Sequence, residues 1–176
     1  AFGLLMLVNE HVTAELRRMA EKDFLTGVFN RRAFLGLLDK ASSLAHRTQS
    51  VLPVLLLDLD HFKQINDRHG HRVGDQVLCH FVAVAEACLR KHDVLGRLGG
   101  EEFALLMPQT RLADAQRVCE RLRATVAAQR FRHGEAAYGV TISIGLVESL
   151  GDEAEAILAA ADRELSQPHI YNKLQK

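Results

Sequence analysis

Residues 97–108 read RLGGEEFALLMP, and this stretch decides the fold of the chain. Apolar residues flank a Gly-Gly pair on both sides, which predicts a β-hairpin with strands over about 94–98 and 102–107. A substrate can approach the backbone at Gly100 closely, because glycine has no Cβ. Glu101 and Glu102 follow directly, and adjacent acids at such a tip suggest a hard cation with a phosphate ligand. A solvated acidic hairpin is the alternative, unless a second group of acids completes the site.

A second group of acids follows an apolar run over residues 51–57, which is typical of a strand buried on both faces. We expect this strand over 52–58. Asp58 and Asp60 stand two residues apart, so in extended chain their carboxylates can project the same way. Charge placed directly after a buried strand is costly unless it is paired or binds a metal. Asp60 could instead cap a short helix over 61–68, but a cap leaves Asp58 unexplained.

Composition places the chain among globular proteins and argues against two kinds of partner. Of its 176 residues, 48% are hydrophobic and 25% charged, which suits one ordinary domain plus a short extension. The 22 basic and 22 acidic side chains cancel, so no global field favours nucleic acid or direct contact with an anionic membrane. Three cysteines, at positions 79, 88 and 119, form no CxxC pair. They are expected to be reduced, which favours a cytoplasmic location.

We divide the chain into an N-terminal helix over residues 1–20 and a domain over residues 21–176. Apolar residues recur at helical spacing in the first segment, at Leu5, Val8, Val12, Leu16 and Met19. The apolar run over 4–8 is too short to span a bilayer. Either this helix packs on the domain, or it is the end of a coiled-coil connector from an upstream sensor. We favour the connector, since the opening reads like the continuation of a longer chain.

Helices and strands alternate along the domain. Further helices are expected over about 31–46, 76–89, 112–128 and 152–166, and a strand rich in β-branched residues over 136–147. This order requires both crossovers and hairpins between strands. The predicted fold class is therefore α/β, in the form of an α+β sandwich with a mixed central β-sheet flanked by helices.

Several motifs resemble the GGDEF-type diguanylate cyclase domain, an enzyme class that condenses two GTP into cyclic di-GMP (c-di-GMP). The matching segments fall in family order and cover roughly residues 21–165: DFLTGVFNRR at 23–32, DLDHFK at 58–63, ND at 66–67, GH at 70–71, GD at 74–75, RLGGEEF at 97–103 and TISIG at 141–145. The resemblance implies a palm-like sheet, as in nucleotide cyclases, with the GGEEF form of the motif on its central hairpin.

The resemblance implies metal and catalytic roles for the two groups of acids. Magnesium, with manganese as an alternative, would be bound by Asp58, the backbone carbonyl of Leu59, Glu101 and Glu102. Glu101 is the expected base for the attacking 3′-hydroxyl, with Glu102 beside it. Divalent ions held by carboxylates suit this chemistry, because they polarise the attacking oxygen and bridge phosphates. The family casts Lys63 as a stabiliser of the developing charge, and a solvated lysine on a short helix is the alternative.

Nucleotide contacts are expected on either side of the short helix. The backbone amides around His61 and Phe62 open that helix, and helix N-termini attract phosphate. By resemblance, Asn66 and Asp75 read the guanine base, and His71 is a substrate neighbour. Asp75 could also be the N-cap of the helix over 76–89, and His71 could be a loop histidine bonded to backbone.

The resemblance also implies product inhibition and a dimer. Arg90 and Asp93 match the family's RxxD site for c-di-GMP, and Arg121 corresponds to its further arginine. Arginine can form two parallel hydrogen bonds to a phosphate or to a guanine edge. A surface ion pair is the alternative for RxxD. One site holds one GTP in this family, whereas the product joins two, so a homodimer is the expected catalytic unit.

The C-terminal segment departs from the family pattern. His169 stands where a phosphate-binding lysine is expected, and Lys173 stands in for an arginine. A mostly neutral histidine holds phosphate less well than an ammonium at pH 7, and Pro168 is expected to end the last helix. Two functions are therefore weighed: an active diguanylate cyclase, and a catalytically silent domain that senses GTP or c-di-GMP. A nucleic-acid polymerase is disfavoured, because no basic groove or template-stacking aromatics are evident.

Overall fold

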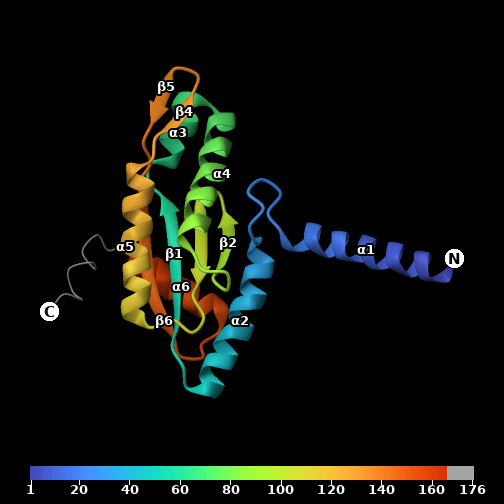
Figure 1. Ribbon diagram of the computed structural model, residues 1–176. Coiled ribbons are helices and arrows are strands. Elements are labelled where there is room, and N and C mark those ends of the chain that lie inside the picture. Colours follow the sequence, from blue (N-terminus) through green and yellow to red (C-terminus); the bar gives the residue numbers. More distant parts are fainter. Residues whose placement is uncertain (166–176) are drawn as a thin grey trace.

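A computed structural model describes residues 1–165 of the chain (Figure 1). Its elements, in order, are α1 (Phe2–Glu21), α2 (Arg31–Thr48), β1 (Leu52–Leu59), α3 (Phe62–His69), α4 (His71–Cys88), β2 (Val94–Gly99), β3 (Glu102–Leu106), α5 (Leu112–Ala128), β4 (Phe131–His133), β5 (Ala136–Tyr138), β6 (Ile142–Ser149) and α6 (Ala154–Leu165). The helix predicted over 112–128 is confirmed at its bounds. Pro168, His169 and Lys173 lie outside the described residues.

Strand β1 lies inside a four-stranded sheet whose order is β2-β3-β1-β6. It pairs antiparallel with β3 on one side and with β6 on the other, so that Leu57 lies opposite both Phe103 and Ile144. Residues 52–57 of β1 are all buried, as the continuous apolar run predicts. The predicted fold class is confirmed, with helices flanking the central sheet. Its strand pairs are antiparallel, and a parallel bridge joins Phe29 to Gly96 at the β2 edge.

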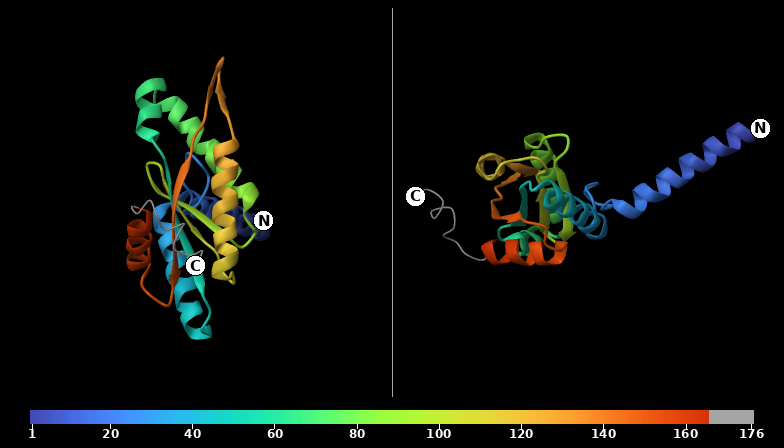
Figure 2. Two further views of the ribbon diagram at one scale, coloured as in Figure 1. Left: turned by 90° about the vertical axis from the view of Figure 1, so that its left-hand side faces the viewer. Right: turned by 90° about the horizontal axis from the view of Figure 1, so that it is seen from below.

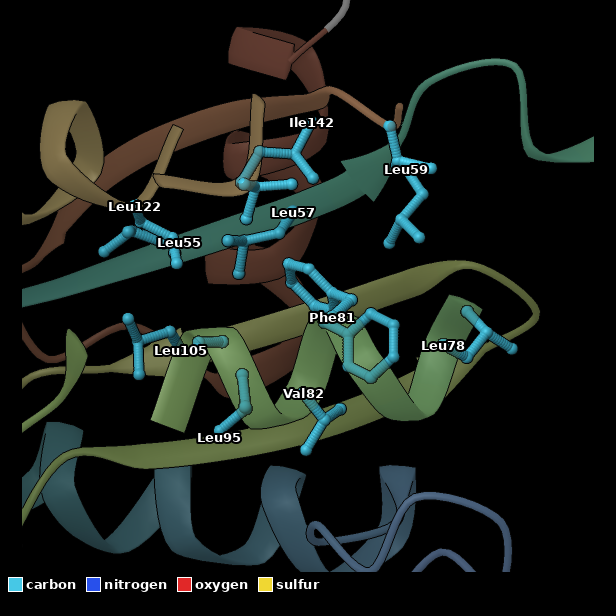
Figure 3. Close-up of a cluster of buried hydrophobic side chains, with 14 of the residues drawn as sticks. Leu55, Leu57, Leu59, Leu78, Phe81, Val82, Leu95, Leu105, Leu122 and Ile142 are labelled. Atoms are coloured by element: carbon cyan, nitrogen blue, oxygen red, sulfur yellow. The ribbon is translucent and has the colours of Figure 1, made fainter. Parts of the chain in front are cut away.

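Helices cover both faces of this sheet (Figures 1 and 2). Because side chains alternate along a strand, Leu55 and Leu57 join a buried cluster with α4 and α5, whereas Val54 and Leu56 join a second cluster with α2 and α6. Figure 3 shows the first cluster, between β1 and α4. Asp58 interrupts this apolar run: it is only partly buried, and Leu59 directly after it belongs to the first cluster again.

Two predicted elements differ from the structure. Helix α4 begins at His71 rather than at 76, because Gly70, with φ +86°, both ends α3 and begins α4. Asp75 therefore lies inside the helix, and its interpretation as an N-cap is wrong. The strand predicted over 136–147 is divided: β5 pairs with β4 in a separate hairpin that turns at Gly134, φ +62°, and β6 pairs with β1.

Helix α1 extends away from the rest of the fold (Figures 1 and 2). It contains no buried residue, and its apolar side chains, including those of Leu5 and Val12, are exposed. The interpretation in which this helix packs on the domain is therefore wrong. None of the helices within residues 1–165 combines the length and hydropathy needed to cross a membrane.

Candidate active site at the end of the central strand

The end of β1 and the turn between β2 and β3 lie side by side. Asp58 is the register partner of Glu102, and the backbone N–H of Leu59 donates to the carbonyl of Glu101 at 3.3 Å. The carboxylates of Asp58, Glu101 and Glu102 are thus carried to one end of the sheet by two segments that are distant in sequence. The structure brings together the two groups of acids that the sequence predicts to share a site.

Two glycines form the turn that carries the glutamates. Gly99 has φ +151° and Gly100 has φ +48°, and side chains with a Cβ are strained in this region. The register between β2 and β3 shifts between Arg97 and Gly99, so Glu102 lies opposite Gly99. A Cβ at Gly100 would meet no atom within 4 Å. Glycine here therefore serves the backbone conformation and leaves the approach to the turn open.

The pKa of Asp58 reflects this arrangement. Its partial burial and the neighbouring charges of Glu101, Glu102, Asp60 and Asp162 raise the pKa of its carboxyl to about 6, from an ordinary 3.8. Carboxylates that crowd together in this way disfavour one another's charge. A cation would relieve the repulsion, so the donor chemistry fits a divalent ion.

No group of three or more His, Cys, Asp or Glu side chains within residues 1–165 is already arranged to hold a metal ion. Mg²⁺ does not require such a cage, because it is commonly held by one or two carboxylates together with substrate phosphates and water. The predicted set, which combines Asp58 and the glutamates with a backbone carbonyl, suits that mode of binding.

Asp60 has a different role from the one considered for it. Its carboxylate accepts hydrogen bonds from the hydroxyls of Thr141 (2.7 Å) and Ser143 (2.6 Å), and its backbone N–H donates to the carbonyl of Thr141 at 2.9 Å. The N-cap of α3 is His61, with φ +56° and no side-chain cap. The cap interpretation of Asp60 is wrong. Asp60 instead fastens the end of β1 to the segment that opens β6.

The first turn of α3 lies directly after these acids. The first donors with a partner inside the helix are the amides of Gln64 and Ile65, which bond the carbonyl of His61 at 3.0 and 3.4 Å. The amides of Phe62 and Lys63 precede them, in the part of a helix that leaves N–H groups for other partners. The side chain of Lys63 is exposed.

Helices α3 and α4 meet at Asn66 and Gly74. A Cβ at position 74 would overlap Asn66 Oδ1 and come within 3.1 Å of the ring of Phe62. Asn66 Oδ1 is buried and has no hydrogen-bond partner among the described residues. Asp75 follows Gly74 directly and is exposed, as is His71 at the start of α4. A buried amide oxygen without a partner is rare in proteins, and a ligand is one explanation.

Arg90, Asp93 and Arg121 are brought together at the end of α4. Asp93 Oδ2 accepts from the backbone N–H of Arg90 at 2.8 Å, and the guanidinium of Arg121 donates to the carbonyl of Cys88 at 2.6 Å. Asp93 Oδ1 is buried without a partner among residues 1–165. The side chains of Arg90 and Asp93 do not form the ion pair that was the alternative for RxxD, and the Arg90 side chain is exposed.

Arg97 and Asp23 form a contact beside the turn that is absent from the predicted site. The guanidinium of Arg97 donates twice to the carbonyl of Gly100, at 3.0 and 2.8 Å, and also to both carboxylate oxygens of Asp23, at 3.3 and 3.2 Å. Burial alone would raise the pKa of Asp23, but bonds from Thr26 and the charge of Arg97 outweigh burial and hold it below its ordinary value. The sequence offered one signal for this contact: Asp23 and Arg97 carry opposite charges, and each begins one of the quoted motifs.

Comparison with known proteins identifies the family of the chain. The family model described as "Diguanylate cyclase, GGDEF domain" matches residues 20–169. The response regulator PleD of Caulobacter vibrioides is 42% identical over 153 residues, which cover 85% of this chain and 34% of PleD. The chain thus spans about a third of the length of that relative.

Two solved structures share the fold over 93% of the chain. One is the diguanylate cyclase SiaD of Pseudomonas aeruginosa in complex with its activator SiaC, at 38% identity and a TM-score of 0.82, with 63% of its own chain covered. The other is the coiled coil and GGDEF domain of DgcB from Caulobacter crescentus in complex with c-di-GMP, at 28% identity and a TM-score of 0.85, with 87% covered. From the match of motifs, fold and family model, this chain belongs to the family of diguanylate cyclase GGDEF domains.

Proposed function

We propose that this chain is a diguanylate cyclase, which converts two GTP into c-di-GMP and two pyrophosphates. The observation that carries the proposal is the convergence of Asp58, Glu101 and Glu102 at the end of β1, where partial burial and the neighbouring carboxylates raise the pKa of Asp58. Such a concentration of negative charge serves a site that accepts a cation, and it costs stability in a site that does not.

The acids have separable roles in this proposal. Asp58, the carbonyl of Leu59, Glu101 and Glu102 would hold Mg²⁺, or Mn²⁺ as an alternative ion. The bound ion would supply charge neutralisation at the phosphates and a more acidic 3′-hydroxyl. Glu101 accepts the proton of that hydroxyl, and Lys63 offers its ammonium to the charge that develops on the phosphate.

The two helices α3 and α4 hold the nucleotide. Asn66 Oδ1, which has no hydrogen-bond partner among the described residues, accepts from a guanine N–H, and the exposed carboxylate of Asp75 can accept from another. Amides at the start of α3, around His61 and Phe62, and the open backbone at Gly100 face the phosphates. His71 neighbours the base, and Lys173 would contact the terminal phosphate.

The product requires two sites that face each other, each with one GTP, so the active unit is a homodimer. Helix α1 offers an exposed apolar face for such an assembly, and we propose that it is the end of a coiled-coil connector. The DgcB structure that this chain resembles comprises a coiled coil and a GGDEF domain. The three cysteines form no disulfide with one another, which fits a cytoplasmic location.

Incubation of the protein with GTP and MgCl₂ over a range of protein concentrations tests the proposal. We expect c-di-GMP, at a rate per protomer that rises with concentration, and we expect Glu101→Gln to reduce product by at least about a hundredfold. Arg117→Lys, at an exposed ion pair on α5, is the matched control and should retain activity. A concentrated, metal-loaded sample that forms no product would contradict the proposal.

A second function is a c-di-GMP sensor without turnover. The observation that favours it is independent of the acids at the end of β1. Asp93 Oδ1 is buried, has no hydrogen-bond partner in the part of the chain that the structure describes, and lies on the Arg90 turn, next to the helix end that Arg121 contacts. In an active cyclase the same site would give product inhibition. Binding of c-di-GMP by a protein that forms none from GTP would select the sensor.

A further inference from the structure

The loop over residues 22–30 touches both helix α1 and the turn that carries Glu101. It begins where α1 ends and leads into α2 (Figure 1). The loop is closed on itself, since Asp23 N–H donates to the carbonyl of Val28 at 2.7 Å and Gly27 N–H to that of Asp23 at 2.8 Å. It is therefore a structured junction and not a flexible linker.

Asn30 ties this junction to two helices. Its side-chain N–H donates to the carbonyl of Ala20 at 2.8 Å, and its backbone N–H donates to that of Glu21 at 2.8 Å. These are carbonyls of the last turn of α1, which an isolated helix leaves without partners. The Asn30 side chain also accepts from the backbone N–H of Ala33, which caps α2. The direction in which α1 leaves the domain is thus set by the junction.

The junction is joined to the active-site strand by backbone and side chain. Phe29 N–H donates to the carbonyl of Leu95 at 3.2 Å, and Arg97 N–H donates to that of Phe29 at 2.8 Å. The Arg97 guanidinium then spans Asp23 on the junction and Gly100 on the turn. Both charged side chains are only 15% exposed, a setting in which charge-assisted bonds are stronger than on an open surface.

We infer that Arg97 is a positioning residue for the turn that presents Glu101, and that Asp23 makes this position depend on the junction that holds helix α1. Gly100 precedes Glu101 directly, so a shift of the Gly100 carbonyl moves the backbone that carries the proposed base. The contacts are contiguous: Asn30 bonds the end of α1, its chain neighbour Phe29 accepts from the backbone of Arg97, and the Arg97 guanidinium bonds Asp23 and Gly100. Such continuity is the physical requirement for coupling of this kind. The kinetic consequence rests on the proposed function, because misplacement of a catalytic group lowers turnover.

Three variants and one control test the inference by amide hydrogen exchange. Arg97→Lys keeps a positive charge beside Asp23, but a single ammonium cannot also make the two hydrogen bonds that the guanidinium makes to the carbonyl of Gly100. Asp23→Asn removes the negative charge that pairs with Arg97. Asn30→Ala removes the side-chain bond to the carbonyl of Ala20 in α1, together with the cap of α2, without touching the turn. The control is Arg117→Lys, the same change at an exposed pair with Asp114.

We expect exchange at residues 100–103 to become about tenfold faster or more in all three variants, with the core of β1 unchanged, and to stay as in the native chain in the control. Unchanged exchange at the turn in Arg97→Lys and Asp23→Asn would overturn the positioning role. Unchanged exchange in Asn30→Ala alone would overturn the dependence on α1. This readout needs no turnover, so it stands even if the chain forms no c-di-GMP. If it does, kcat should fall about tenfold or more in Arg97→Lys while KM for GTP changes less.

Discussion

Replacement of Asp58 by Asn should make the metal-free protein more stable at pH 8 and remove its activity. The carboxylate is charged at that pH, and its partial burial and the charges of Glu101, Glu102 and Asp60 raise its pKa to about 6. An acid with a raised pKa in the folded state destabilises that state wherever it is ionised. The penalty is therefore present above about pH 6 and disappears as the pH falls toward 3.8.

The size of the effect follows from the same pKa. The difference between about 6 and 3.8 corresponds to at most about 3 kcal/mol. Because the carboxyl of Asp58 is only partly buried, solvent screening reduces this to about 1–2 kcal/mol. For a domain of this size, that gain is roughly 2–8 °C in the melting temperature.

The assay is urea or thermal unfolding of both proteins in chelator, from about pH 8 down to about pH 5. We expect the Asn variant to be more stable at pH 8 and the difference to shrink as the pH falls. Saturating Mg²⁺ should stabilise the native protein and affect the variant little, since only the native site binds the ion tightly. Asp67→Asn, the same change at an exposed position on α3, is the control.

A native protein at least as stable as the Asp58→Asn variant at pH 8 would refute the electrostatic reasoning. So would a stability difference that does not change with pH. Retention of full activity by the variant would refute the metal-binding role.

Three further predictions concern the binding of the guanine base, the c-di-GMP site and helix α1. Gly74→Ala should raise KM for GTP about tenfold or more, because its Cβ would overlap Asn66 Oδ1; an unchanged KM in a folded variant would contradict this. Arg90→Ala should raise the inhibitory concentration of c-di-GMP by about tenfold to a hundredfold, since one charge-assisted contact is lost, and unchanged inhibition would remove the product site. Val12→Glu, at an exposed apolar position of α1, should shift activity to higher protein concentration without lowering the melting temperature. Ala14→Glu, on the opposite face by helical spacing, is its control, and equal behaviour of the two would argue against an α1 interface.

The errors in the predicted elements share a physical cause. Glycine disfavours helix interiors, yet α4 continues through Gly74, since the absent Cβ lets Asn66 pack there. Residues 136–147 have strand propensity throughout, but only those from 142 onward pair with β1, and residues 136–138 form a separate hairpin with β4. In both cases a contact from another segment overrode a local preference.

The sequence by itself determined the buried central strand, the glycine hairpin and the two groups of acids at their ends. These features are written in local patterns of burial, turn chemistry and charge, and the motifs that contain them were sufficient to suggest the family. Only the tertiary structure decided that Asp60 fastens β1 to Thr141 and Ser143, and that Arg97 joins Asp23 to the turn at Gly100. Such bonds depend on which distant segments the packed sheet brings within about 3 Å of each other, and no local pattern encodes that distance.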